Sequence, residues 1–322
     1  MNLNLYVYSK YRTQIMGLAA IMIILCHVRG LDYSQVSYME KIIWLGNYGV
    51  ELFLFVSGLG MYHSLNQNDE KLVQWYKRRY LRITIPFVLI TTAIYPFRFV
   101  LGVYASLPDF LLSITTLEFW LYHRGAWYVA MLFPLYLFTP CLVNELNSKY
   151  KYLIMSVMII MLLFVSHVHV ENNIICNIQF VLVRIPFYIL GIGLAPLVMS
   201  KYNLKIRYAS AIFMVGMMIW HYLGVSFGGG IVIVLLTGFL VNIIVENRIV
   251  NKVLTFVGTM SLESYLTNIY LGHIIMKSKK LVLSGGGKIL MVIVVGILTA
   301  YIFNKMSNHI IDKIKKCHTS IF

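Results

Sequence analysis

The amino-acid sequence predicts an all-α integral membrane protein with about ten transmembrane helices and both termini on the cytoplasmic side. Of the 322 residues, 59% are hydrophobic and only 12% are charged, well below the roughly 25% typical of soluble domains. Apolar stretches long enough to cross a bilayer follow one another along nearly the whole chain, without the alternation of barrel strands. We therefore expect one transmembrane domain over residues 1–322.

Apolar length and flanking residues define the first five segments. A hydrocarbon core of about 30 Å needs roughly 20 helical residues, and the first such stretch follows polar residues around Lys10 and Arg12. A basic run precedes the third segment, and Trp127 and Tyr128 open the fourth, as interfacial aromatic residues do. The expected spans are 13–32, 42–62, 82–104, 127–146 and 152–169.

Glycines and charged residues help to place the second five segments. Arg184 opens the outer part of the sixth, where its long side chain is expected either to snorkel to the interface or to pack among the helices. Gly228, Gly229 and Gly230 indicate a tight turn at 225–228 between the seventh and eighth. The expected spans are 178–198, 208–225, 228–245, 258–276 and 288–306.

The basic residues are distributed asymmetrically across these crossings. An N-in, C-in orientation puts most of the 27 lysines and arginines in inner segments, in agreement with the positive-inside rule. One outer loop, with Lys277, Lys279, Lys280 and Lys288, is an exception, so either it binds an anionic group or the last two crossings are misplaced. The formal charge of +15 is expected to meet anionic membrane lipids and not nucleic acid.

The four cysteines have no paired spacing. Cys26, Cys141, Cys176 and Cys317 are scattered along the chain, and three of them lie in or beside apolar segments. The sequence therefore predicts neither a disulfide framework nor a metal site.

His27 and Glu51 are ionisable residues inside the first two apolar segments. An ionisable group at the centre of a membrane helix costs about 2.5 to 3.5 kcal/mol on insertion scales, so each is a functional candidate. A short connection should make the two helices antiparallel neighbours, and a carboxylate that orients the imidazole would make His27 a general base. The alternative is that both residues form interhelical hydrogen bonds that hold the bundle together.

A basic run, WYKRRYLRITIP, precedes the third apolar segment and contains Arg78, Arg79 and Arg82. Arg79 and Arg82 are three residues apart and share a helix face, which suits planar guanidinium groups that bind phosphates. Acyl-CoA, a nucleotide-bearing thioester, carries such phosphates. The alternative is that the run is only the positive-inside anchor of a helix end.

Further candidates lie near the fourth and ninth segments. Trp127 and Tyr128 are either membrane anchors or a stacking floor for a sugar ring. Glu263 and Asn268 are five residues apart, about 140° around a helix, so at most one is expected to face a catalytic cavity.

Five strings in one order carry a resemblance to a known family. They are GLAAIMIILCH, GVELFLFVSG, RRYLRITIP, GAWYVAMLFPLYLFTP and GTMSLESYLTNIYL. The chain is similar over roughly residues 12 to 306 to the bacterial acyltransferase-3 family of membrane-bound acyltransferases. In that family's pattern the histidine corresponds to His27, the acidic motif to Glu51 with Ser57 and Gly58, and the basic motif to Arg79 and Arg82.

This resemblance implies a function. It implies ten core helices in the bacterial cytoplasmic (inner) membrane and transfer of an acyl group, for which acetyl is the expectation, from cytoplasmic acyl-CoA. The acceptor would be a hydroxyl of a cell-envelope carbohydrate or a lipid-linked saccharide. Acyl-CoA is then the donor substrate, and no metal is required.

Two positions depart from the family's pattern. Many members carry an arginine eleven residues before the histidine, where this sequence has Met16, and a histidine is common where Asn268 stands. The retained His27 and Glu51 favour an active enzyme, and the alternative is a member that has lost catalysis. A transporter or flippase of a lipid-linked saccharide is a further alternative, but the internal repeats and paired broken helices of transporters are missing.

Overall fold

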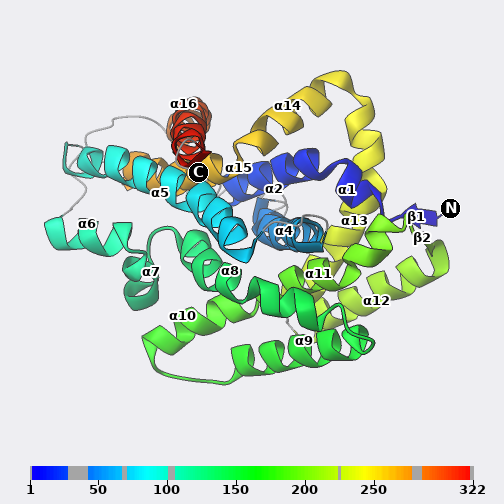
Figure 1. The fold of residues 1–322 in the computed structure, drawn as a ribbon. Coiled ribbons are helices and arrows are strands. Elements are labelled where there is room, and N and C mark those ends of the chain that lie inside the picture. Colours follow the sequence, from blue (N-terminus) through cyan, green and yellow to red (C-terminus); the bar gives the residue numbers. More distant parts are fainter. Residues whose placement is uncertain are drawn as a thin grey trace. The chain divides into compact units, whose positions relative to one another are not determined.

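The computed structural model describes residues 2–27, 43–66, 71–100, 106–223, 226–277 and 285–319. The described chain is almost entirely helical (Figure 1), which confirms the all-α class. A short antiparallel ribbon pairs β1 (Asn2–Asn4) with β2 (Asn203–Lys205), with Asn2 opposite Lys205.

The chain divides into two compact units, each assembled from three separate stretches. Unit 1 consists of Met1–Ile23, Asn47–Glu70 and Phe138–Thr259. Unit 2 consists of Ile24–Gly46, Lys71–Leu137 and Met260–Phe322. The helices α2 (Arg12–His27) and α8 (Trp127–Glu145) and the short 3-10 helix η2 (Leu45–Tyr48) contribute residues to both units. The single domain expected over residues 1–322 stays a prediction.

Unit 1 contains the helices of the middle of the chain together with two from its N-terminal part. These are α1 (Val7–Lys10), α4 (Gly49–Asn66), α9 (Lys151–His167), α10 (Asn173–Leu182), α11 (Ile185–Met199), α12 (Ile206–Leu223), α13 (Ser226–Glu246) and α14 (Arg248–Thr259). The helix α4 packs closely against α11, and α12 packs against α13. Tyr8 of α1 closes the interior, because its ring packs edge-on against Phe55 and its hydroxyl donates to the carbonyl of Val234.

The contact between α4 and α11 is possible because glycines stand where the helices approach. A Cβ on Gly191 would collide with the carbonyl oxygen of Phe55, and a Cβ on Gly58 would lie 3.1 Å from Cα of Gly191. Small residues at such positions let membrane helices pack backbone to backbone. The packing of α4 on α11 also brings Glu51 of α4 close to the N-terminal end of α11.

We expect Gly191→Ala to destabilise unit 1, because the added methyl group forces two helix backbones apart. Overpacking of this kind costs about 1–3 kcal/mol, and thermal unfolding in lipid nanodiscs measures it. Gly296→Ala in α16 is the matched control, since a Cβ there meets nothing within 4 Å. An equal loss in both variants would show that the α4–α11 contact is not special.

The glycine triplet 228–230 has a different place from the one predicted. The helix α13 begins at Ser226, so these glycines belong to its first turns and not to a turn at 225–228, of which residue 225 lies outside the described ranges. A Cβ on Gly229 would strike the Tyr48 hydroxyl, and one on Gly230 would strike the Phe187 ring. Close side-chain packing, and not a change of chain direction, requires glycine here.

Unit 2 contains the two longest described helices, α5 (Leu72–Val100) and α16 (Gly285–Thr319). Its other helices are α6 (Leu107–Ile114), α7 (Leu117–Tyr122) and α15 (Ser261–Lys277). The helices α5, α15 and α16 all pack against one another. Two tyrosines attach α8 to α5, since Tyr76 and Tyr80 donate to the carbonyls of Leu137 and Phe133 at 2.8 Å. These helices carry most of the predicted site residues.

Helix length and composition support a membrane protein. Within the described ranges, five helices are long and apolar enough to cross a bilayer: Leu72–Val100, Trp127–Glu145, Asn173–Met199, Ser226–Glu246 and Leu290–Lys316. Each predicted segment overlaps a described helix. The ten crossings and the N-in, C-in orientation stay predictions, and Lys279 and Lys280 of the basic outer loop lie outside the described residues.

Candidate functional site

His27 ends α2 and belongs to unit 2, where the side chain of Asn268 on α15 lies within reach of its imidazole. Oδ1 of Asn268 has no hydrogen-bond partner among the described residues. The histidine side chain is exposed, whereas Asn268 is buried. A hydrogen bond at one ring nitrogen orients an imidazole and leaves the other nitrogen for proton transfer. The Asn268 amide is therefore the group placed to orient His27.

Glu263 lies on the same helix but has other partners. Its buried carboxylate is hydrogen-bonded to Asn304 of α16 and feels the charge of Arg82 on α5. The helical angle between Glu263 and Asn268 sends the two side chains to different neighbours. Of this pair, Asn268 is the one that meets the candidate base.

The basic run occupies the first turns of α5. Arg78 and Arg79 are half-buried and Arg82 is exposed. The guanidinium carbon of Arg79 lies 5.7 Å from the centre of the Trp75 ring, so this tryptophan supports the arginine by a cation–π contact. The run therefore presents guanidinium groups at the surface of the unit that contains His27.

Glu51 forms a buried ion pair within unit 1. Its Oε1 accepts a hydrogen bond of 2.7 Å from Nη1 of Arg184, whose Nη2 donates to Oδ1 of Asn47 at 3.1 Å. Glu51 is 2% exposed and Arg184 is 6% exposed, so both charges are removed from solvent. Oε2 of Glu51 has no hydrogen-bond partner among the described residues.

Of the two places expected for Arg184, the interfacial one is wrong, because the residue is packed in the interior. The residue directly precedes α11, and the packing of α11 on α4 turns its side chain inward onto Glu51. Sequence reasoning missed this role, although a lone arginine inside an apolar stretch is the usual sign of a buried partner.

Two contacts confirm that α2 and α4 are antiparallel neighbours within unit 1. A Cβ on Gly49 would lie 2.6 Å from the carbonyl oxygen of Ala19, and one on Gly60 would lie 2.7 Å from Nη2 of Arg12. The start of each helix therefore lies near the end of the other. His27 and Glu51 belong to different units, so their pairing stays a prediction.

The remaining candidates are mostly interior residues. Ser57 is buried in α4. Trp127 is half-buried, whereas Tyr128 is buried and packs edge-on against Tyr265, whose hydroxyl accepts a hydrogen bond of 3.0 Å from the Tyr128 backbone. This packing explains Tyr128 without a ligand, and a sugar-stacking role for Trp127 stays a prediction.

A cavity of about 450 Å³ lies in unit 2 among α5, the α6–α7 turn and α8. Its lining is mainly apolar, with hydroxyl groups from three threonines and no ionisable side chain. It contains none of the predicted catalytic residues. Among the described residues no group of three or more histidine, cysteine, aspartate or glutamate side chains is placed to hold a metal ion.

Comparison with protein families gives one match that covers nearly the whole chain. A family model described as an acyltransferase domain, acyltransferase-3, matches residues 15–305. No significant match was found among curated proteins or among solved structures. The matched range contains every site residue discussed above.

Proposed function

Because this chain belongs to the acyltransferase-3 family, we propose that it transfers an acyl group, with acetyl the expected one, from cytoplasmic acyl-CoA to a carbohydrate hydroxyl of the cell envelope. The protein is then a membrane-bound acyltransferase of the bacterial inner membrane. A lipid-linked saccharide is an acceptor of the same chemistry.

The contact between His27 and Asn268 carries this proposal. It places an amide beside the imidazole in the unit that also holds the basic run of α5. A base for the attacking hydroxyl and cations for the donor phosphates are the two requirements of acyl transfer from a nucleotide-bearing thioester.

The reaction follows from these groups. The free nitrogen of His27 removes the acceptor hydroxyl proton as the oxygen attacks the thioester carbonyl carbon. The carbon–sulfur bond then breaks, the thiolate takes the proton from the imidazolium, and the products are an ester and free CoA. A two-step route, in which His27 carries the acyl group transiently, uses the same residues.

Purified protein in lipid nanodiscs, supplied with radiolabelled acetyl-CoA and an envelope glycan fraction, tests the proposal. We expect alkali-labile label on the glycans, because an ester is formed. Empty nanodiscs give the background. Labelling at background level would overturn the proposed function and leave the flippase and the inactive family member as the alternatives.

Arg79→Gln and Arg82→Gln are each expected to raise the half-saturating acetyl-CoA concentration about 10-fold, because each removes a charge-assisted contact to a phosphate. Initial rates of label transfer against donor concentration provide the measurement. Lys149→Gln neutralises an exposed cation of unit 1 and is the matched control. An unchanged half-saturating acetyl-CoA concentration in both arginine variants would show that the basic run serves only as a membrane anchor.

A further inference from the structure

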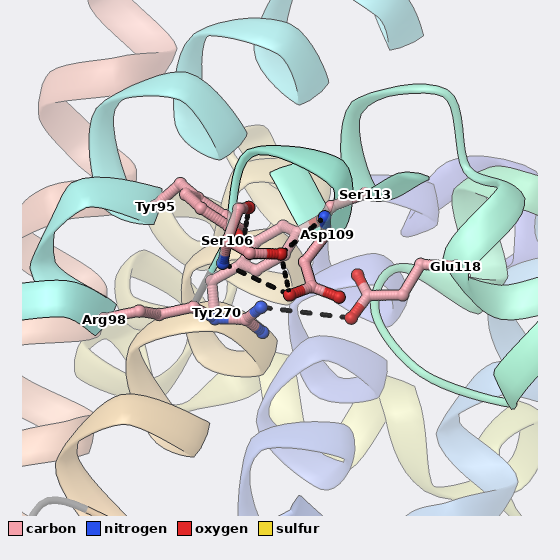
Figure 2. A network of polar contacts seen from close by, with 7 residues as sticks. All are labelled: Tyr95, Arg98, Ser106, Asp109, Ser113, Glu118 and Tyr270. Atoms are coloured by element: carbon pink, nitrogen blue, oxygen red, sulfur yellow. Dashed lines mark hydrogen bonds and ion pairs between the residues drawn. The ribbon is translucent and has the colours of Figure 1, made fainter. Parts of the chain in front are cut away.

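Unit 2 contains a second group of buried charges that the reaction above does not use. Arg98 of α5 and Glu118 of α7 are each 8% exposed. Figure 2 shows their side chains pointing toward one another, with the Arg98 Nη1 to Glu118 Oε1 distance at 3.9 Å. This separation is longer than a hydrogen bond.

Both side chains keep unused hydrogen-bonding capacity. Nε of Arg98 and Oε2 of Glu118 have no hydrogen-bond partner among the described residues. A buried charged group left in this way is costly, and a native protein tolerates it mainly where a function requires it. The two neighbouring side chains therefore offer one hydrogen-bond donor, Nε of Arg98, and one acceptor, Oε2 of Glu118.

Local structure holds this pair in place. Ser106 and Asp109 form a capping box that starts α6, and the Tyr95 hydroxyl donates to the Ser106 carbonyl at 2.8 Å, which ties α6 to α5 (Figure 2). The short helix α7 then begins after Thr116, which has φ of 64°, and carries Glu118 in its first turn. The Glu118 carboxylate therefore lies directly after a helix, α6, that hydrogen bonds fix to α5.

Two tyrosine rings lie beside the guanidinium group of Arg98. The Arg98 carbon Cζ lies 5.4 Å from the centre of the Tyr95 ring and 5.9 Å from that of Tyr270. Tyr270 lies on α15 only two residues after Asn268, the partner of His27, and two residues rise roughly 3 Å along a helix. One helix therefore contacts both the candidate base and the Arg98–Glu118 pair.

The free carboxylate oxygen faces a surface loop. A Cβ on Gly125 would lie 2.9 Å from Oε2 of Glu118. Gly125 also has φ of +77°, a backbone conformation that residues with a side chain rarely adopt. The two residues before this glycine, His123 and Arg124, are exposed. Gly125 therefore lies directly over Oε2 of Glu118, an oxygen that is buried and makes no hydrogen bond among the described residues.

We infer that Arg98 and Glu118 bind the acceptor, through two neighbouring hydroxyl groups of a sugar. One hydroxyl donates to Oε2 of Glu118, and the oxygen of the next accepts from Nε of Arg98. Glu118 would repel a phosphate, and an alkyl chain would leave both groups unsatisfied, so a polyhydroxylated acceptor fits best. This inference rests on the proposed function and names its acceptor site.

Glu118→Gln and Arg98→Lys keep the shape of the pair and change its hydrogen bonding. Two rates are measured in nanodiscs with radiolabelled acetyl-CoA: hydrolysis without acceptor, and transfer to an increasing amount of the envelope glycan fraction. We expect the half-saturating glycan concentration to rise about 10- to 100-fold in each variant, with hydrolysis unchanged. Glu145→Gln, on an exposed carboxylate of α8, is the matched control.

The measured rates distinguish failure of the acceptor site from failure of the proposed function. A normal glycan saturation curve in Glu118→Gln and Arg98→Lys would overturn the acceptor site while the proposed function stands. A parallel fall of hydrolysis and transfer would also overturn it, because it indicates a structural ion pair. Absence of transfer in the wild type would overturn the proposed function, and the acceptor site with it.

Discussion

Replacing His27 by alanine is expected to lower the rate of acyl transfer by about 100- to 10,000-fold, the range that a general base contributes. Without the imidazole, the acceptor hydroxyl must attack while it keeps its proton. The initial rate of label transfer at saturating acetyl-CoA measures the loss. Thermal unfolding should change little, because the His27 side chain is exposed.

Two further variants make this prediction specific. His309→Ala removes an exposed histidine of α16 and should leave the rate unchanged. Asn268→Ala keeps the imidazole but removes the amide beside it, so we expect an intermediate loss of about 10- to 100-fold, as for groups that orient a functional histidine. Transfer at the wild-type rate in His27→Ala would remove this residue from the mechanism.

The second large effect is expected at the buried ion pair of unit 1. Arg184→Met leaves the Glu51 carboxylate buried without its cation, and breaking a buried pair in this way costs about 3–5 kcal/mol. Thermal or denaturant-induced unfolding in nanodiscs should show this loss of stability. Arg207→Met, which removes an exposed arginine of α12, should change the free energy of unfolding by less than about 0.5 kcal/mol.

A double-mutant cycle separates the pair from simple loss of packing. Glu51→Gln combined with Arg184→Met removes both charges, so we expect part of the lost stability to return. If the double variant is as unstable as the sum of the two single variants, the two side chains do not interact energetically. The pair would then be a consequence of packing alone.

The Glu51–Arg184 contact also bears on the role expected for Glu51. One carboxylate oxygen is committed to Arg184 at 2.7 Å, and Oε2 has no hydrogen-bond partner among the described residues. The pairing of Glu51 with His27 that the sequence predicts stays a prediction. The rate of transfer in Glu51→Gln, compared with that in Asn268→Ala, tests whether either side chain contributes to catalysis.

The sequence by itself determined the fold class, the family and the identity of most candidate residues. Hydropathy is a local property, so long apolar stretches identify helices such as α5 and α13 without knowledge of their neighbours. Ionisable residues inside those stretches, such as His27 and Glu51, stand out for the same reason, because their burial is costly.

Only the tertiary structure decided which of these residues meet. Glu51 and Arg184 are 133 positions apart, and their contact depends on the packing of α4 on α11. Likewise, Arg98 and Glu118 become a candidate acceptor site only because α6 and α7 fold back onto α5. The sequence carries no local signal for such pairs, since they depend on how helices distant along the chain approach and rotate against one another.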